Sequence, residues 1–118
     1  MEGSNEIRKN QLIEHLIENS IFTKRQIEII YNRIKKEKVR RVSRGAYYRV
    51  LLQSRDNIRK VLYSIILLEI VGIIDKDKKM TIDRVIKQLE LFMNSDSDID
   101  VSDVIYIIDK VMKELSKV

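Results

Sequence analysis

Apolar residues recur at helical spacing along most of this chain of 118 residues. Between residues 6 and 19, isoleucine and leucine return every three or four positions, which predicts an amphipathic helix. Residues 20–22 interrupt this pattern. Thr23 then opens a capping box with Gln26, in which each side chain bonds the backbone amide of the other residue. The apolar pattern resumes after the box and predicts a second helix that ends at about Lys38, before a short connector.

The longest regular pattern covers residues 43–71. Ser43 is a favourable N-cap residue. The positions after it alternate steps of four and three, as in the heptad-like seam of one long helix. The seam consists of Tyr47, Leu51, Ser54, Ile58, Val61, Ile65 and Leu68. A second interpretation fits the same pattern: Ser54 caps a new helix, Gly72 is its C-cap, and residues 73–82 form the β-hairpin wing of a winged-helix domain.

Two further helices are predicted towards the C-terminus. Thr81 follows a turn rich in Lys and Asp and is expected to cap a helix whose apolar face includes Phe92. A polar, acidic loop comes next. One of Asp98, Asp100 and Ser102 is then expected to cap an amphipathic final helix.

These elements predict an all-α fold, with or without a small wing, in a single domain of residues 1–118 that contains a long central helix. Residues 65–74 are apolar on nearly all sides, apart from Glu69 and Gly72. Because a helix of this kind is hard to cover in a small chain, we expect a homodimer with this run at the interface. The C-terminal pair at 81–118 is a second candidate for dimerisation, and a deep core beneath that pair is the alternative to an interface.

Composition supports a helical fold and argues against several kinds of chemistry. Hydrophobic residues make up 44% of the chain, there is no proline, and only three glycines interrupt helix formation. With no cysteine and one histidine, we expect no thiolate metal site and no catalytic triad. There is also no glycine-rich phosphate loop. We therefore predict a protein that is not an enzyme, needs no cofactor and resides in the cytoplasm, since no apolar stretch resembles a signal or a membrane span.

An acidic stretch, DSDID at 96–100, begins like a calcium-binding loop. The rest of the stretch does not match the calcium-loop pattern, because Val101 stands where glycine is required and Ile107 where the bidentate glutamate belongs. We therefore interpret this stretch as a linker that caps the final helix.

Charge is distributed unevenly along the chain. Residues 1–34 are neutral, residues 61–118 carry a net charge of −3, and residues 35–60 carry ten basic against two acidic side chains, a net +8. The net charge of this segment is larger than the +5 of the whole chain. Concentrated basic charge is typical of a surface that binds polyanions. The alternative is a solvated helix face in a protein rich in lysine.

The candidate nucleic-acid-binding residues come from this segment and the helix start beside it. They are Lys38, Arg40, Arg41, Ser43, Arg44, Tyr48, Arg49, Arg55, Arg59 and Lys60. At 100° per residue, Arg44, Tyr48, Arg55 and Arg59 fall within a 60° stripe of one helix. Lysine and arginine would neutralise phosphates and release counterions, and the amides at the helix start favour phosphate as well. Tyr47 belongs to the apolar seam and is expected in the core, while Tyr48 is expected either to pack or to stack on an exposed base.

The stretches FTKRQIEIIYNRI and SRGAYYRVLLQSRDNI together resemble archaeal helix-turn-helix DNA-binding proteins of the sigma-region-4 and Tfx type. The matching residues are Thr23, Arg25, Gln26, Ile27, Ile30, Ser43, Arg44, Tyr48, Arg55, Asn57 and Ile58. In this chain KKEKVRRV stands where the family has a short positioning helix. The resemblance implies that the helix after Ser43 enters the major groove of DNA.

The sequence thus favours a dimeric DNA-binding transcription regulator, with double-stranded DNA as its partner. The alternative is an all-helical protein-interaction module, such as an accessory subunit of a replication or transcription complex, whose basic segment faces an acidic partner. RNA binding is a third hypothesis.

Overall fold

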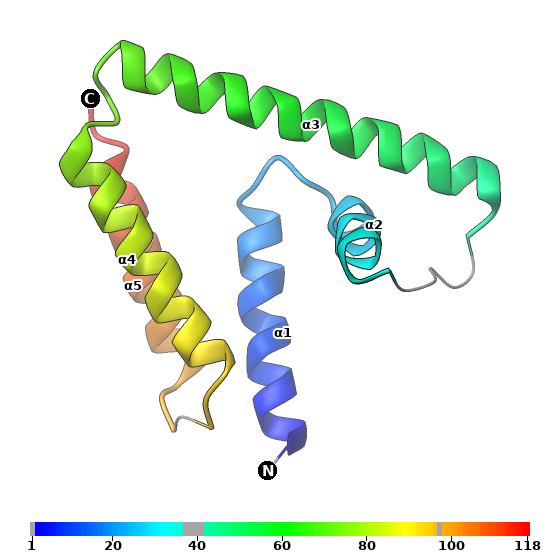
Figure 1. Cartoon of the computed structure of the whole chain (residues 1–118). Helices are drawn as coiled ribbons and strands as arrows, with labels where there is room; N and C mark the ends of the chain where they lie inside the picture. Colours follow the sequence, from blue (N-terminus) through cyan, green and yellow to red (C-terminus); the bar gives the residue numbers. More distant parts are fainter. Residues whose placement is uncertain (1, 37–41, 97) are drawn as a thin grey trace. The chain divides into compact units, whose positions relative to one another are not determined.

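The computed structural model describes residues 2–36, 42–96 and 98–118, and within these residues the chain forms helices and no strand (Figure 1). The helices are α1 (Glu2–Glu18), α2 (Lys24–Lys35), α3 (Arg44–Ile70), α4 (Lys76–Met93) and α5 (Val101–Leu115). The all-α class is therefore confirmed.

The chain divides into two compact units. Glu14–Ser64 forms one unit, here called the basic unit, which contains α2 and most of α3. Met1–Ile13 and Ile65–Val118 form the other, here called the terminal unit, which contains α4 and α5. Each unit has its own small core. Ile29 and Leu51 are buried in the basic unit, and Leu12, Val101 and Ile108 in the terminal unit.

The central stretch is one helix, and the interpretation with two helices is wrong. Ser54 is completely buried inside α3, and its hydroxyl donates to the Val50 carbonyl at 2.7 Å, so it caps no new helix. The C-terminal end is set by Gly72, which has a φ of +88° that residues with a side chain rarely adopt. Its N–H donates to the Glu69 carbonyl at 3.1 Å and closes the last turn.

The predicted wing is also wrong, because helix α4 begins where the hairpin was expected. The Asp75 carboxylate accepts a hydrogen bond from the Lys78 amide at 2.8 Å and caps α4 six residues before the expected cap, Thr81. Thr81 lies inside the helix and does not cap it. Its hydroxyl donates to the Asp77 carbonyl at 3.0 Å. The Lys and Asp residues of the expected turn thus form the first turn of α4.

The ends of the other helices differ from the prediction by a few residues. α1 begins at Glu2 instead of residue 6. α2 ends at Lys35, before the predicted Lys38, because Lys36 takes the left-handed conformation (φ 58°), in which its N–H reaches the carbonyls of the last turn. For α5, Asp100 is the cap among the three candidates, and its carboxylate accepts from the Ser102 amide at 3.0 Å.

Candidate nucleic-acid interface

The start of α3 is set by Ser43, as predicted. Its hydroxyl oxygen accepts from the Ala46 amide at 3.2 Å, and its carbonyl accepts from the Tyr47 amide at 2.9 Å. The first bond satisfies an amide that a helix start otherwise leaves without a partner, and the second is the first regular hydrogen bond of the helix. Arg44 is therefore the first residue of a helix that carries all the later candidates.

A polar network joins α2 to α3 within the basic unit. The predicted capping box is present: the Thr23 hydroxyl accepts from the Gln26 amide at 3.1 Å, and the Gln26 side chain accepts from the Thr23 amide at 3.0 Å. The same oxygen of Gln26 also accepts from the Asn57 side chain of α3 at 3.0 Å. Because Gln26 is buried, this shared acceptor fixes α3 against the start of α2.

Seven of the ten predicted site residues fall within the described part of the chain, and all seven are exposed in the basic unit. They are Ser43, Arg44, Tyr48, Arg49, Arg55, Arg59 and Lys60. The other three, Lys38, Arg40 and Arg41, lie outside the described residues. Because α3 is uninterrupted, Arg44, Tyr48, Arg55 and Arg59 do share one stripe of its surface.

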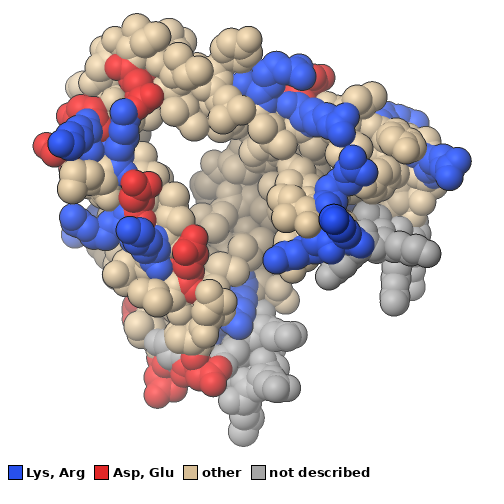
Figure 2. Space-filling model, viewed as in Figure 1, with Lys and Arg blue, Asp and Glu red and all other residues tan. Residues whose placement is uncertain are grey.

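Charge separates along the same boundary as the two units. The sequence of the basic unit carries a net +8, and that of the terminal unit a net −3. Figure 2 shows Lys and Arg with little acid among them over α2 and α3, and both signs mixed over α4 and α5. The positive potential of the chain is therefore concentrated on one unit.

Several cations of this surface make no ion pair. Among residues 14–36 and 42–64, Arg44, Arg49, Arg55 and Lys60 have no acidic side chain within ion-pair distance, whereas Arg59 pairs with Asp56 at 3.1 Å. The Arg59 pair is largely exposed and therefore weak, so an anion can displace it at little cost.

Two adjacent tyrosines differ in their surroundings. Tyr47 is half-buried on the seam that packs into the unit, whereas 56% of Tyr48 is exposed beside the cations. Their rings meet edge to face, with centroids 5.7 Å apart, so Tyr47 holds the ring of Tyr48 at the surface. The structure thus places Tyr48 among the candidate contact residues and Tyr47 among the packing residues.

The C-terminal end of helix α2 adds cations that were not among the candidate residues predicted from the sequence. Arg33, Lys35 and Lys36 are exposed at its C-terminal end, and the Lys35 ammonium lies 5.9 Å from the centre of the Tyr31 ring. The charge run starting at Lys35 signalled two of these three, and the division into units assigns Arg33 to the same unit.

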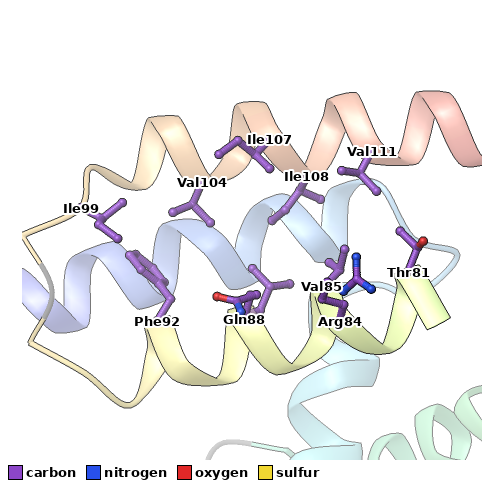
Figure 3. Close-up of a pocket in the computed structure, with 11 residues that line it drawn as sticks. Thr81, Arg84, Val85, Gln88, Phe92, Ile99, Val104, Ile107, Ile108 and Val111 are labelled. Atoms are coloured by element: carbon purple, nitrogen blue, oxygen red, sulfur yellow. The ribbon is translucent and has the colours of Figure 1, made fainter.

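The terminal unit carries a different kind of feature, an apolar cavity of about 420 Å³ between α4 and α5. Side chains from the two helices point towards one another across it, and Ile99 closes one end (Figure 3). Its few polar lining residues, Thr81, Arg84 and Gln88, all come from α4. A second cavity of about 350 Å³ lies at the other end of this unit, between Ile73 and Met112.

Other kinds of site find no support in the described part of the chain. No group of acidic or histidine side chains there could hold a metal ion, and no helix there is long and apolar enough to cross a bilayer. Comparison of the chain with protein-family models, with curated proteins and with solved structures finds no significant match.

Proposed function

We propose that the basic unit binds nucleic acid, double-stranded DNA in the first instance, and that the chain acts as a DNA-binding transcription regulator. The observation that carries this proposal is the set of unpaired cations on α3, which project from one continuous helix in a unit of net charge +8. A polyanion supplies the negative charges that these side chains do not find within the chain. Binding also releases the counterions of the polyanion.

The geometry of α3 supports contact with a duplex. Arg44, Arg55 and Arg59 follow one stripe, and Arg49 and Lys60 lie about 80–100° farther around the helix, so cations cover a broad band along about four turns of helix. Phosphates on the two sides of a groove can meet such a band while the helix lies between them. Tyr48 projects from the same stripe and can pack against a sugar or a base edge.

The proposal is tested by fluorescence anisotropy with a labelled duplex at several salt concentrations. Four phosphate contacts predict that the logarithm of the binding constant falls with the logarithm of salt with a slope of about −3.6. The pair Arg44→Glu and Arg55→Glu should lower the magnitude of that slope by about 1.8 and weaken binding at least tenfold.

A matched control makes the same change in charge on the terminal unit, with Lys87→Glu and Lys110→Glu, both of which are exposed. This pair should leave the slope unchanged. Absence of binding at about 50 mM salt, or an equal loss in both double variants, would show that α3 is not the contact surface. Competition by duplex RNA and single-stranded DNA identifies the preferred form of nucleic acid.

A further inference from the structure

The last third of α3 and Val71 after it expose a set of large apolar side chains that no other described residue covers. Their exposed fractions run from 54% for Ile66 to 77% for Ile70. The set consists of Leu62, Tyr63, Ile66, Leu67, Ile70 and Val71. The alternative, a deep core beneath the C-terminal pair, does not bury this run, since Ile65 and Leu68 are exposed as well.

These side chains form two adjacent ridges along the helix. Leu62, Ile66 and Ile70 follow one another at steps of four, and Tyr63, Leu67 and Val71 do the same beside them. Together their exposed parts amount to roughly 700 Å², close to the 800 Å² or so that each partner contributes to a standard interface. Ridges at steps of four pack into the grooves of another helix with the same pattern, so this surface is complementary to itself.

We propose that α3 pairs in antiparallel orientation with α3 of a second copy of this chain, with Ile66 near the two-fold axis. Residues 62 to 70 of one copy then lie against residues 70 to 62 of the other, and the apolar ridges cover each other. A two-fold axis through Ile66 makes the interface isologous, as in most homodimers.

Charge favours the antiparallel orientation over the parallel one. The exposed half of α3 changes character along its length: the part before residue 61 carries Arg44, Arg49, Arg55, Arg59 and Lys60, and the part after it is apolar. A parallel pair would set each of these cations opposite the same cation of its partner, which is unfavourable. An antiparallel pair overlaps only the apolar parts and directs the two basic parts away from each other.

This arrangement also sets the spacing of the two basic parts, and here the inference rests on the proposed function. The basic part is centred near residue 54, twelve residues from Ile66, which corresponds to about 18 Å along a helix. Because ridges at steps of four cross at about 50°, the two centres in an antiparallel pair are about 33 Å apart, and successive half-sites on one face of B-DNA are separated by about 34–36 Å. The dimer would contact two grooves one helical turn apart.

The pairing itself is tested without nucleic acid. Sedimentation equilibrium should show a dimer, and Ile66→Glu should raise its dissociation constant at least about 100-fold, because two carboxylates would face each other at the axis. Ile86→Glu is the matched control: the residue lies on α4, is 47% exposed, and should leave the dimer unchanged. Circular dichroism verifies that both variants are folded. A chain that stays monomeric at tens of micromolar would overturn the pairing.

Orientation is tested by cross-linking, because the chain contains no cysteine of its own. An Ile66→Cys variant should oxidise to a covalent dimer. A Leu52→Cys variant should not, since the two copies of residue 52 would be about 38 Å apart in the antiparallel pair. Covalent dimers from both variants would indicate a parallel pair and overturn the inference.

The spacing is tested by comparing duplexes of about 24 and about 10 base pairs, which offer room for two half-sites and for one. The wild type and Ile86→Glu should prefer the longer duplex at least tenfold more than Ile66→Glu does. Duplex binding by a chain that forms no dimer would refute the pairing and leave the proposed function intact. A dimer that binds no duplex would refute the proposed function and leave the pairing intact.

Discussion

Gln26 is the residue on which the packing of α2 against α3 should depend most strongly. One oxygen of its side chain accepts from the Thr23 amide and from the Asn57 side chain, at 3.0 Å in both cases. Replacement by alanine removes both bonds and leaves two partly buried donors without an acceptor. At about 1 kcal/mol for each bond, with an added penalty for the unpaired donors, Gln26→Ala should lower the free energy of unfolding by about 2–3 kcal/mol.

Asn57→Ala removes only one of these bonds and should lower the free energy of unfolding by about 1 kcal/mol. Because Asn57 and Gln26 share a bond, the loss of unfolding free energy in the double variant should be about 1 kcal/mol smaller than the summed losses of the two single variants. Arg25→Ala is the control on the same turn of α2. It breaks only an exposed ion pair with Glu28 and should change the free energy by less than about 0.5 kcal/mol.

Urea unfolding followed by tyrosine fluorescence measures these differences in the right part of the chain. The protein has no tryptophan, and four of its five tyrosines, all except Tyr106, belong to the basic unit. A coupling energy near zero, or a Gln26→Ala variant no less stable than Arg25→Ala, would show that the capping box does not connect α2 with α3.

Two further predictions concern the core and the helix end. Ile29 is completely buried in the basic unit, so Ile29→Ala should lower the free energy of unfolding by about 2–5 kcal/mol. Ile34 is 71% exposed, so Ile34→Ala should lower it by less than about 0.5 kcal/mol in the same urea experiment. Gly72→Ala should lower the free energy of unfolding by about 1 kcal/mol in the same experiment. The positive φ at this position is the cause, because an added Cβ would touch nothing there. Gly45 lies in the first turn of α3 and is equally open, so Gly45→Ala should instead raise the melting temperature.

The sequence predicted the elements whose signal is local. Thr23 with Gln26 and Ser43 before α3 are caps in which a side chain bonds an amide three residues away, so the residue types and their spacing contain the whole interaction. The apolar period likewise predicted α5, because its buried face lies at regular helical positions. The candidate cations on α3 follow from one further fact, that the helix continues through Ser54.

The prediction failed where two local signals competed. Ser54 has the chemistry of a cap, yet its hydroxyl bonds Val50 within the same helix, and only packing decides between these uses. The Lys and Asp residues after Ile74 looked like a turn, but Asp75 caps α4 while the lysines continue the helix. The bond between Asn57 and Gln26 joins residues 31 positions apart, which no local pattern can indicate.

The continuity of α3 has a consequence for how binding and pairing are related. If the chain broke at Ser54, Arg44 and Arg49 would belong to a different element from the apolar residues of 62–71, and their separation would vary with the joint. One uninterrupted helix fixes that separation at 1.5 Å per residue, so the spacing between two basic parts depends only on where the two copies pair. Leu51 and Ser54, which are buried in the basic unit, lie about 80° around the helix from the stripe of Arg44, Arg55 and Arg59, so this stripe faces solvent. A single element can therefore set both which surface meets phosphate and how far apart two such surfaces lie.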